Sequence, residues 1–320
     1  MNSLLKVTRL LGGECVALLE CSENSRLSEL SSEAVVALYQ KYGALLFRGF
    51  HCNAKEFVAF TERFSTHFST YKGGAFRLGS LDRKSVNNNE TLLTTTGDSQ
   101  SFSIPIHGEM YYLKKPPSMI WFFCEKPPIS RGETTVCSGS QLLNALSGDC
   151  RAFFRNNRIK YIRTLSAEQW RQSFQTENIE DVQKICAEND TSFAYDKKSD
   201  TIKTEYICSA IVEVNGQEVF INNVLPVYLA EWMAKNKPSK MPMLADKPFP
   251  LIVRMEDGKP IPNDVFIELY DVAENLTIGI EWRQCDFLMI NNKTHMHGRN
   301  ESDGSERRIY VRMGEGMMCT

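Results

Sequence analysis

The sequence predicts a mainly β protein with flanking helices, an α+β arrangement that forms a single domain over residues 1–320. Short extended runs separated by Pro-Pro and Gly turns fill residues 103–137, and similar runs return after residue 200. Helical periodicity is confined to the N-terminal stretch and to about 140–190, which we expect to be a helical insertion. We find no internal repeat or shift in composition, so nothing indicates a domain boundary.

The elements before residue 70 follow from local signals. Ser31 or Ser32 can cap a helix that Gly43 ends, and the residues after Gly43 read as a buried strand. Phe57, Phe60 and Phe64 recur at helical spacing and predict a second helix. The polar stretch at 70–103 then predicts a long loop.

The later elements alternate between strands and helices. The expected helices are Gln141–Leu146, one around Trp170 and one over Val182–Ala187. The expected strands are Ile104–Tyr112, Met119–Cys124, Thr134–Cys137, Tyr206–Val214, Glu218–Asn222, Leu251–Arg254, Ile278–Trp282, Asp286–Ile290 and Ile309–Arg312.

Composition excludes several classes of protein. Lys plus Arg is 37 and Asp plus Glu is 39, so the chain lacks the basic excess of a dedicated nucleic-acid binder. No apolar run reaches the roughly 18 residues that a membrane-spanning helix needs, and the N-terminus makes a poor secretory signal. The 10 cysteines are spread singly, which is typical of reduced thiols in a cytoplasmic protein.

Three of the five histidines fall in patterns that suit a metal site. A strand would place His107 and Glu109 on one face, because side chains two apart point the same way. His295 and His297 follow another expected strand far along the chain. Two histidines and one carboxylate form the facial triad of non-haem iron(II) oxygenases, although a lone His-x-Glu is common in chains of this length. The pattern alone leaves His295 and His297 as alternatives.

These motifs resemble the taurine dioxygenase and clavaminate synthase-like family of iron(II), 2-oxoglutarate oxygenases. His107-Gly108-Glu109 and Gly132-Glu133-Thr134 look like that family's iron-binding strand and the strand that follows it. Asn291-Asn292-x4-His297-Gly298-Arg299 is similar to the family's Asp-Asn-x4-His-Gly-Arg motif. This chain differs from the family at two positions: Arg131 replaces a glycine and Asn291 replaces the aspartate. A Glu in the first motif points to the clavaminate synthase-like branch.

The resemblance implies a double-stranded β-helix, a jelly-roll barrel of two facing sheets. It also implies that His107, Glu109 and His297 bind Fe(II). His295 is then expected either to contact these ligands without binding the metal or to serve only in packing. Thr134 and Arg308 are then expected to anchor the distal carboxylate of the co-substrate 2-oxoglutarate, with Arg307 as the alternative to Arg308. Oxygen is the other co-substrate, and succinate and carbon dioxide are released when an unactivated C–H bond is oxidised.

The last expected strand carries a second arginine, Arg312, which we expect to bind the substrate. Arg308, Tyr310 and Arg312 share one face of this strand, and Ile309 and Val311 share the other. In an ordinary sandwich the arginines would face water. In a barrel with a polar lumen they would point inward, so we expect Arg312 to bind an acidic group of the substrate.

The sequence thus predicts an oxygenase that acts on a small carboxylate or amino-acid-like molecule, by hydroxylation or by desaturation or cyclisation. The loop at 70–103, with Tyr71, Lys72 and Arg77, is expected to close over the pocket mouth. Two alternatives remain open. One is the same chemistry on a protein or nucleic acid, and the other is a non-catalytic barrel used as a binding module.

Overall fold

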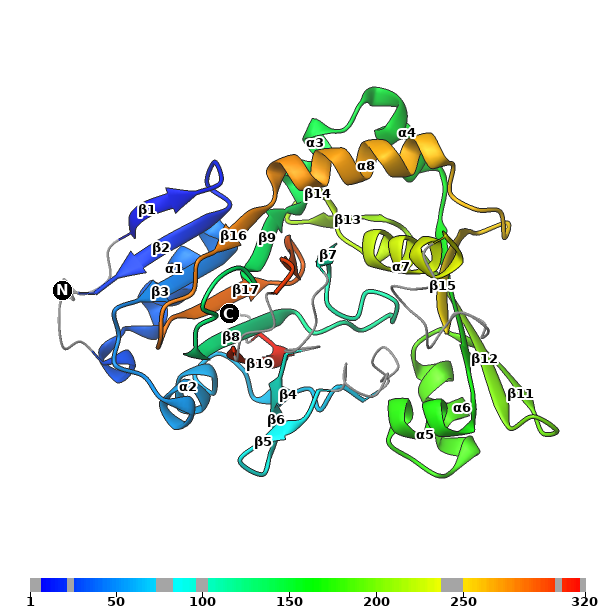
Figure 1. Ribbon diagram of the computed structural model, residues 1–320, viewed down its shortest axis with the longest axis horizontal. Coiled ribbons are helices and arrows are strands. Elements are labelled where there is room, and N and C mark those ends of the chain that lie inside the picture. The colour runs from blue at the N-terminus through cyan, green and yellow to red at the C-terminus, as the bar shows by residue number, and fades with distance from the viewer. Residues whose placement is uncertain are drawn as a thin grey trace.

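The computed structural model describes residues 7–21, 26–72, 83–95, 103–236, 250–302 and 307–316. Strands within these ranges form sheets of nine, four, four and two strands, with helices around them (Figure 1). This confirms the prediction of a mainly β protein with flanking helices. Each of the sheets in the described ranges is open, and none closes on itself as a barrel.

The largest sheet has nine strands, and its order is β1-β2-β3-β17-β8-β19-β6-β5, with β4 also paired to β19. Its central strands are rich in aromatic and branched residues, as in strands buried on both faces. The strands are β1 (Val7–Leu11), β2 (Val16–Glu20), β3 (Ala44–Arg48), β4 (His67–Phe68), β5 (Ser85–Val86), β6 (Asn89–Thr94), β8 (Met119–Lys126), β17 (Phe287–Asn291) and β19 (Arg308–Glu315).

A four-stranded sheet of order β16-β9-β18-β7 faces the nine-stranded sheet. The ring of Phe122 on β8 lies 5.2 Å from the ring of His297 on β18, so the inner faces of the two sheets are in contact. The strands are β7 (Ile104–His107), β9 (Thr134–Ser138), β16 (Ile278–Ile280) and β18 (His295–Arg299). The candidate site lies between these two sheets.

The insertion at about 140–190 is only partly helical, contrary to the sequence-based prediction. It contains β10, which pairs with later strands in a separate sheet of order β11-β12-β10-β15. This sheet lies at the lower right of Figure 1, beside α5 and α6. Its strands are β10 (Ile159–Leu165), β11 (Ser192–Asp196), β12 (Thr201–Cys208) and β15 (Leu251–Met255), and the small hairpin beside it is β13 (Ile211–Val214) with β14 (Gln217–Phe220).

The helices pack outside the two facing sheets or against the inserted sheet β11-β12-β10-β15. On the outer face of the nine-stranded sheet, Phe57 of α2 stacks on Phe123 of β8 at 5.3 Å. The Ser31 side chain accepts a hydrogen bond from the Ala34 backbone N–H, and Gly43 ends α1 at φ 73°, which confirms these sequence signals. The helices are α1 (Ser32–Tyr42), α2 (Ala54–Thr61), α3 (Gly139–Ala145), α4 (Gly148–Asn156), α5 (Ala167–Phe174), α6 (Ile179–Glu188), α7 (Val224–Asn236) and α8 (Asn263–Leu276), and η1 (Leu27–Glu29) is a short 3-10 turn.

Two further predictions need correction. The stretch at 70–103 is not a loop throughout, because β5 and β6 form a hairpin within it. Arg77 and the residues around it, 73–82, lie outside the described residues, as do 96–102. The single strand expected over Tyr206–Val214 is split between β12 and β13. Of the helices in the described ranges, none is both long and apolar enough to cross a membrane.

Candidate metal centre

Three predicted ligands converge on the inner face of the four-stranded sheet. His107 at the end of β7 is the cross-strand partner of His297 on β18, and their rings lie 4.6 Å apart. The Oε2 atom of Glu109 lies 3.4 Å from the Nε2 atom of His297. One ligand atom from each of the three residues lies within 4.8 Å of the others. Residues nearly 190 positions apart in sequence therefore form one cluster with the donor set of a facial triad.

Glu109 reaches this cluster through a turn and not along a strand. β7 ends at His107, and Met110 adopts a left-handed conformation at φ 61°, so the chain reverses directly after the carboxylate. Gly108 is needed inside the turn, because a Cβ atom there would lie 2.5 Å from the Tyr111 ring and 2.8 Å from Ile221. The expectation that Glu109 continues the strand is therefore wrong, since the turn brings its side chain to His297.

Asn292, from the second motif, holds the backbone of Glu109. Its side-chain oxygen accepts a hydrogen bond from the Glu109 N–H at 2.8 Å, and its amide donates to the Glu109 carbonyl at 3.1 Å. The same amide donates to the Pro117 carbonyl at 2.6 Å. Because Asn292 is fully buried, these three bonds fix the position of the turn that carries the carboxylate.

Arg83 neutralises the carboxylate of Glu109. Its Nη2 atom lies 2.8 Å from Glu109 Oε2, and both side chains are buried. Burial alone would raise the pKa of Glu109, but the Arg83 and His297 side chains outweigh it and hold that pKa below its usual range. Burial lowers the pKa of His107 to about 4. At neutral pH the site therefore holds a carboxylate and a neutral imidazole, which are the forms that bind metal.

Hydrogen bonding also orients His107. Its Nδ1 atom lies 2.9 Å from the Pro105 carbonyl, to which an Nδ1–H group donates. This tautomer leaves the lone pair on Nε2 available to a metal, as in many metal sites where a carbonyl fixes the second ring nitrogen.

His295 lies outside this cluster. Its Nδ1 atom is 2.9 Å from the Thr294 hydroxyl, and the side chain is buried beneath Gly43. A Cβ atom at Gly43 would lie only 2.3 Å from His295 Cε1, so the imidazole fills the space against the end of α1. These contacts indicate a packing role.

Thr134 and Arg307 lie at the other end of the same sheet. Thr134 is the cross-strand partner of Arg299, and its hydroxyl accepts a hydrogen bond from the Trp282 indole at 3.1 Å. Arg307 is buried, and its Cδ atom would lie 3.6 Å from a Cβ atom placed on Gly132, two residues before Thr134. A hydroxyl and a buried guanidinium therefore gather near the start of β9.

Arg308 and Arg312 do not point toward the cluster, so their predicted inward orientation is wrong. Arg308 is exposed, and its Nη1 atom lies 3.2 Å from the Glu125 carboxylate. Arg312 is buried on the side of α2, where it donates to the Val58 carbonyl at 3.0 Å and the Thr61 hydroxyl at 2.6 Å. The opposite face of β19 is the one that faces the site, because Met313 lies 3.2 Å from Arg83.

Sequence reasoning missed one charged residue at the site and ranked another second. Arg307 shares its strand face with Ile309 and Val311, and the sequence favours it only as the alternative to Arg308, because the other face is expected to point inward. Arg83 lies in a polar stretch that shows no periodicity. No sequence pattern points to Arg83, since its partner Glu109 is 26 residues further on.

Comparisons with known proteins identify a family that covers most of the chain. The family described as "Taurine catabolism dioxygenase TauD, TfdA family" matches residues 8–313. A clavaminate synthase-like protein of Arabidopsis thaliana is 24% identical over 286 residues, which cover 85% of this chain and 81% of the relative.

Solved structures show the same fold at low sequence identity. A taurine dioxygenase from Burkholderia xenovorans aligns with a TM-score of 0.59 and 13% identity, over 98% of this chain and 89% of that one. PvcB, described as an Fe, alpha-ketoglutarate dependent oxygenase from an isonitrile synthetic pathway, aligns with a TM-score of 0.56 and 15% identity, over 97% and 90% of the two chains.

Proposed function

The chain belongs to the taurine catabolism dioxygenase TauD, TfdA family, and from this premise we propose that it oxidises an unactivated C–H bond of a small carboxylate or amino-acid-like substrate. Its class is that of the iron- and 2-oxoglutarate-dependent dioxygenases, in agreement with the sequence-based prediction of enzyme and cofactors. In hydroxylation, one oxygen atom of O2 enters the product and the other enters succinate, while 2-oxoglutarate loses carbon dioxide. The convergence of His107, Glu109 and His297 is the observation that carries the proposal.

The three side chains fit Fe(II) by their chemistry. Two imidazoles and one carboxylate on one side of a metal leave positions open for other ligands. Iron held there would supply the centre at which O2 is reduced and 2-oxoglutarate is decarboxylated. The protein keeps its ligands ready, because Asn292 fixes the Glu109 backbone and Pro105 fixes the His107 tautomer.

Arg307 and Thr134 are our proposed anchor for the distal carboxylate of 2-oxoglutarate. Arg307 takes the role expected of Arg308, because Arg307 is the buried member of the pair. A guanidinium can hold a carboxylate through two parallel hydrogen bonds, and the Thr134 hydroxyl can donate a third. The Trp282 indole donates to that hydroxyl and orients its proton away from itself.

We further propose that the two facing sheets form the jelly-roll core of a single cytoplasmic oxygenase domain. The contact between Phe122 and His297 supports this arrangement, since it packs the inner faces of both sheets around the site. The complete ligand set and the family description favour an enzyme over a non-catalytic binding module.

Succinate formation tests the proposed function. The purified chain, supplied with Fe(II), 2-oxoglutarate and O2, should form succinate slowly even without a prime substrate. Glu109→Ala should abolish this reaction, since it removes one ligand of the triad. Succinate formation by Glu109→Ala at the wild-type rate would refute the proposed site.

A further inference from the structure

Arg83 is held at the candidate metal centre by contacts from three segments of the chain. Its Nη2 atom donates to the Oε2 atom of Glu109 at 2.8 Å, and its Nη1 atom donates to the sulfur of Met313 at 3.2 Å. Its guanidinium carbon lies 4.4 Å from the centre of the Tyr71 ring, and the side chain is only 7% exposed. These contacts fix the direction of the guanidinium as well as its place.

The turn that carries Tyr71 is tied to the strand that carries Met313. Tyr71 adopts a left-handed backbone conformation at φ 65°, which is uncommon for a residue other than glycine. Its N–H donates to the Ser69 hydroxyl at 3.0 Å, and the Ser69 N–H donates to the Met313 carbonyl at 2.9 Å. Backbone strain of this kind persists where surrounding contacts hold it, and it is common at functional sites. The strained turn therefore supports the ring on which the Arg83 guanidinium lies.

One oxygen of Glu109 contacts Arg83 and also lies close to His297. This Oε2 atom accepts the hydrogen bond from Arg83 and lies 3.4 Å from the Nε2 atom of His297. A metal bound by that nitrogen would therefore meet Glu109 at Oε2, the oxygen that Arg83 holds. If the carboxylate turned so that both of its oxygens reached the metal, it would strain or break this hydrogen bond. Such charge-assisted hydrogen bonds are among the stronger polar contacts in proteins.

From this arrangement we propose that Arg83 is a positioning residue that keeps Glu109 bound to the metal through one oxygen only. A facial triad functions because its three ligand atoms leave the remaining metal positions open. A carboxylate that binds through both oxygens would fill one of the positions that 2-oxoglutarate and O2 need. The inference rests on the proposed function and deepens it, since it assigns to Arg83 the protection of an open metal position.

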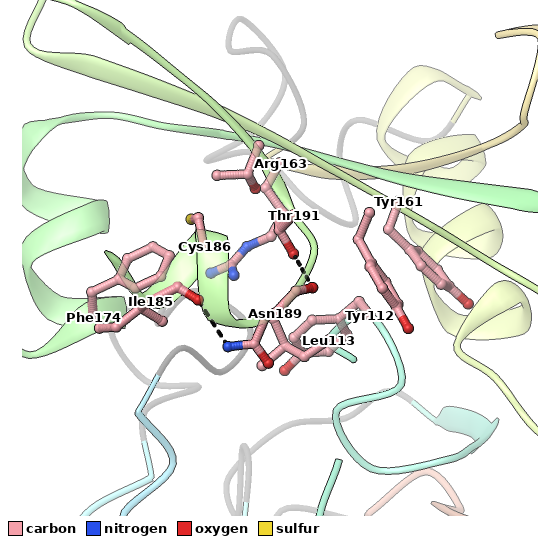
Figure 2. Close-up of a pocket in the computed structure, with 11 residues that line it drawn as sticks. Tyr112, Leu113, Tyr161, Arg163, Phe174, Ile185, Cys186, Asn189 and Thr191 are labelled. Carbon is pink, nitrogen blue, oxygen red and sulfur yellow. Dashed lines mark hydrogen bonds between the residues drawn. The ribbon is translucent and has the colours of Figure 1, made fainter. Parts of the chain in front are cut away.

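The competing explanation is that Arg83 only neutralises a buried carboxylate and supports the fold. Arg83→Met removes the guanidinium and keeps an unbranched side chain, whereas Arg83→Lys keeps the charge and a donor. Arg163→Met is the matched control for the loss of a buried arginine. Figure 2 shows Arg163 among the residues that line a small cavity under the inserted sheet. Its guanidinium carbon lies 5.2 Å from the Phe174 ring, and its Nη2 atom donates to the Ser173 hydroxyl at 2.6 Å.

Equilibrium binding provides the first readout, and it does not depend on turnover. Each protein is titrated calorimetrically with Mn(II), and the Mn(II)-loaded form is then titrated with 2-oxoglutarate. Arg83→Met should bind Mn(II) at least as tightly as wild type, because the second carboxylate oxygen becomes available to the metal. It should bind 2-oxoglutarate about tenfold or more weakly, a loss at least the size of one charged hydrogen bond. A merely supporting role predicts the opposite for the metal, since loss of a residue that only orients a ligand lowers metal affinity about tenfold or more.

The number of water molecules on the metal provides the second readout. Relaxation of water protons by bound Mn(II) counts the waters that occupy its open positions. In the absence of 2-oxoglutarate, Arg83→Met should hold one water fewer than wild type, because a carboxylate oxygen takes its place. A loss of charge alone leaves this number unchanged. Arg83→Lys should return the count and part of the 2-oxoglutarate affinity toward wild type, and Arg163→Met should match wild type in both readouts.

Each outcome decides the proposal. It is overturned if Arg83→Met binds Mn(II) more weakly than wild type, if it keeps the wild-type affinity for 2-oxoglutarate, or if it keeps the wild-type number of metal-bound waters. It is also overturned if Arg163→Met shows the same changes, because they would then follow from the loss of any buried arginine. Failure of the proposed function would show differently, as a wild-type chain that forms no succinate.

Discussion

β18 and β19 both carry polar side chains at alternate positions, but these side chains lie on differently directed faces of the two strands. On β18, His297 faces the candidate metal centre and pairs with His107 across the sheet. On β19, Arg308 and Arg312 lie on the outer face, and the apolar residues between them face the site. The inward face of β18 is the polar one, whereas the inward face of β19 is the apolar one.

The difference shows what alternation can and cannot predict. Period-two spacing identifies the residues that share a face of a strand, and on β19 it did so correctly for Arg308 and Tyr310, which both contact Glu125. It does not identify which face is inward when both are covered, as on β19, where α2 buries Arg312 on the outer side. Predictions about these two strands therefore test the assignment of faces directly.

The largest expected effect concerns the two histidines of β18. His297→Ala should lower the affinity for Fe(II) or Mn(II) at least about a hundredfold, because it removes a proposed metal ligand. Loss of a residue that only holds such a ligand in place already lowers metal affinity about tenfold or more. His295→Ala should keep the metal and lower only the thermal stability, since it empties the space beneath Gly43. Metal content after dialysis measures both. Loss of metal in His295→Ala alone would reverse the assignment.

The next effect compares Arg307 with Arg308. Removing the charged partner of a buried carboxylate costs about 3 to 5 kcal/mol, so Arg307→Met should weaken 2-oxoglutarate binding at least about a hundredfold. Arg308→Met should change it less than about twofold, because an exposed ion pair such as Arg308–Glu125 is worth little. Titration of the Mn(II)-loaded chain with 2-oxoglutarate gives both values. A larger loss of 2-oxoglutarate affinity in Arg308→Met than in Arg307→Met would mean that the face of β19 with Arg308 points toward the site.

Most of the elements could be predicted because their signals are local. Ser31 and Gly43 mark the ends of α1, and the apolar run after Gly43 forms β3. β10 was missed although its buried residues alternate strictly over Ile159–Leu165. The helical patterns on either side of β10 outweighed that alternation, and its partners β12 and β15 come much later in the chain.

The candidate site was predictable only where short motifs mark it. His107, Glu109 and His297 lie in such motifs, and the structure brings them together. Arg83 could not be found, because its role depends on a contact with Glu109 and not on its neighbours in sequence.

A smaller effect should separate packing from binding on β19. Arg312→Met should lower the free energy of unfolding by about 2 to 3 kcal/mol, because the Val58 carbonyl and Thr61 hydroxyl lose a charged donor inside the protein. The Michaelis constant for the prime substrate should stay unchanged. Urea unfolding and substrate titration measure the two quantities. Arg308→Met is the control and should change stability by about 0.5 kcal/mol or less. If Arg312→Met raises the Michaelis constant and leaves the free energy of unfolding unchanged, Arg312 contacts the substrate after all.

The smallest effect concerns pH and again compares histidines. Burial lowers the pKa of His295 to about 4, below the ordinary value of about 6.5 expected in the unfolded chain. Between these values the unfolded chain binds the extra proton, so the free energy of unfolding should fall as the pH drops from about 6.5 to 4.

His107, whose pKa burial also lowers to about 4, adds to this slope when metal is removed by a chelator. His295→Gln should reduce the slope by at most about 1.4 kcal/mol per pH unit. Urea unfolding of the chelator-treated protein across this range measures the slope, and an equal slope in His295→Gln would show that His295 stays protonated in the fold.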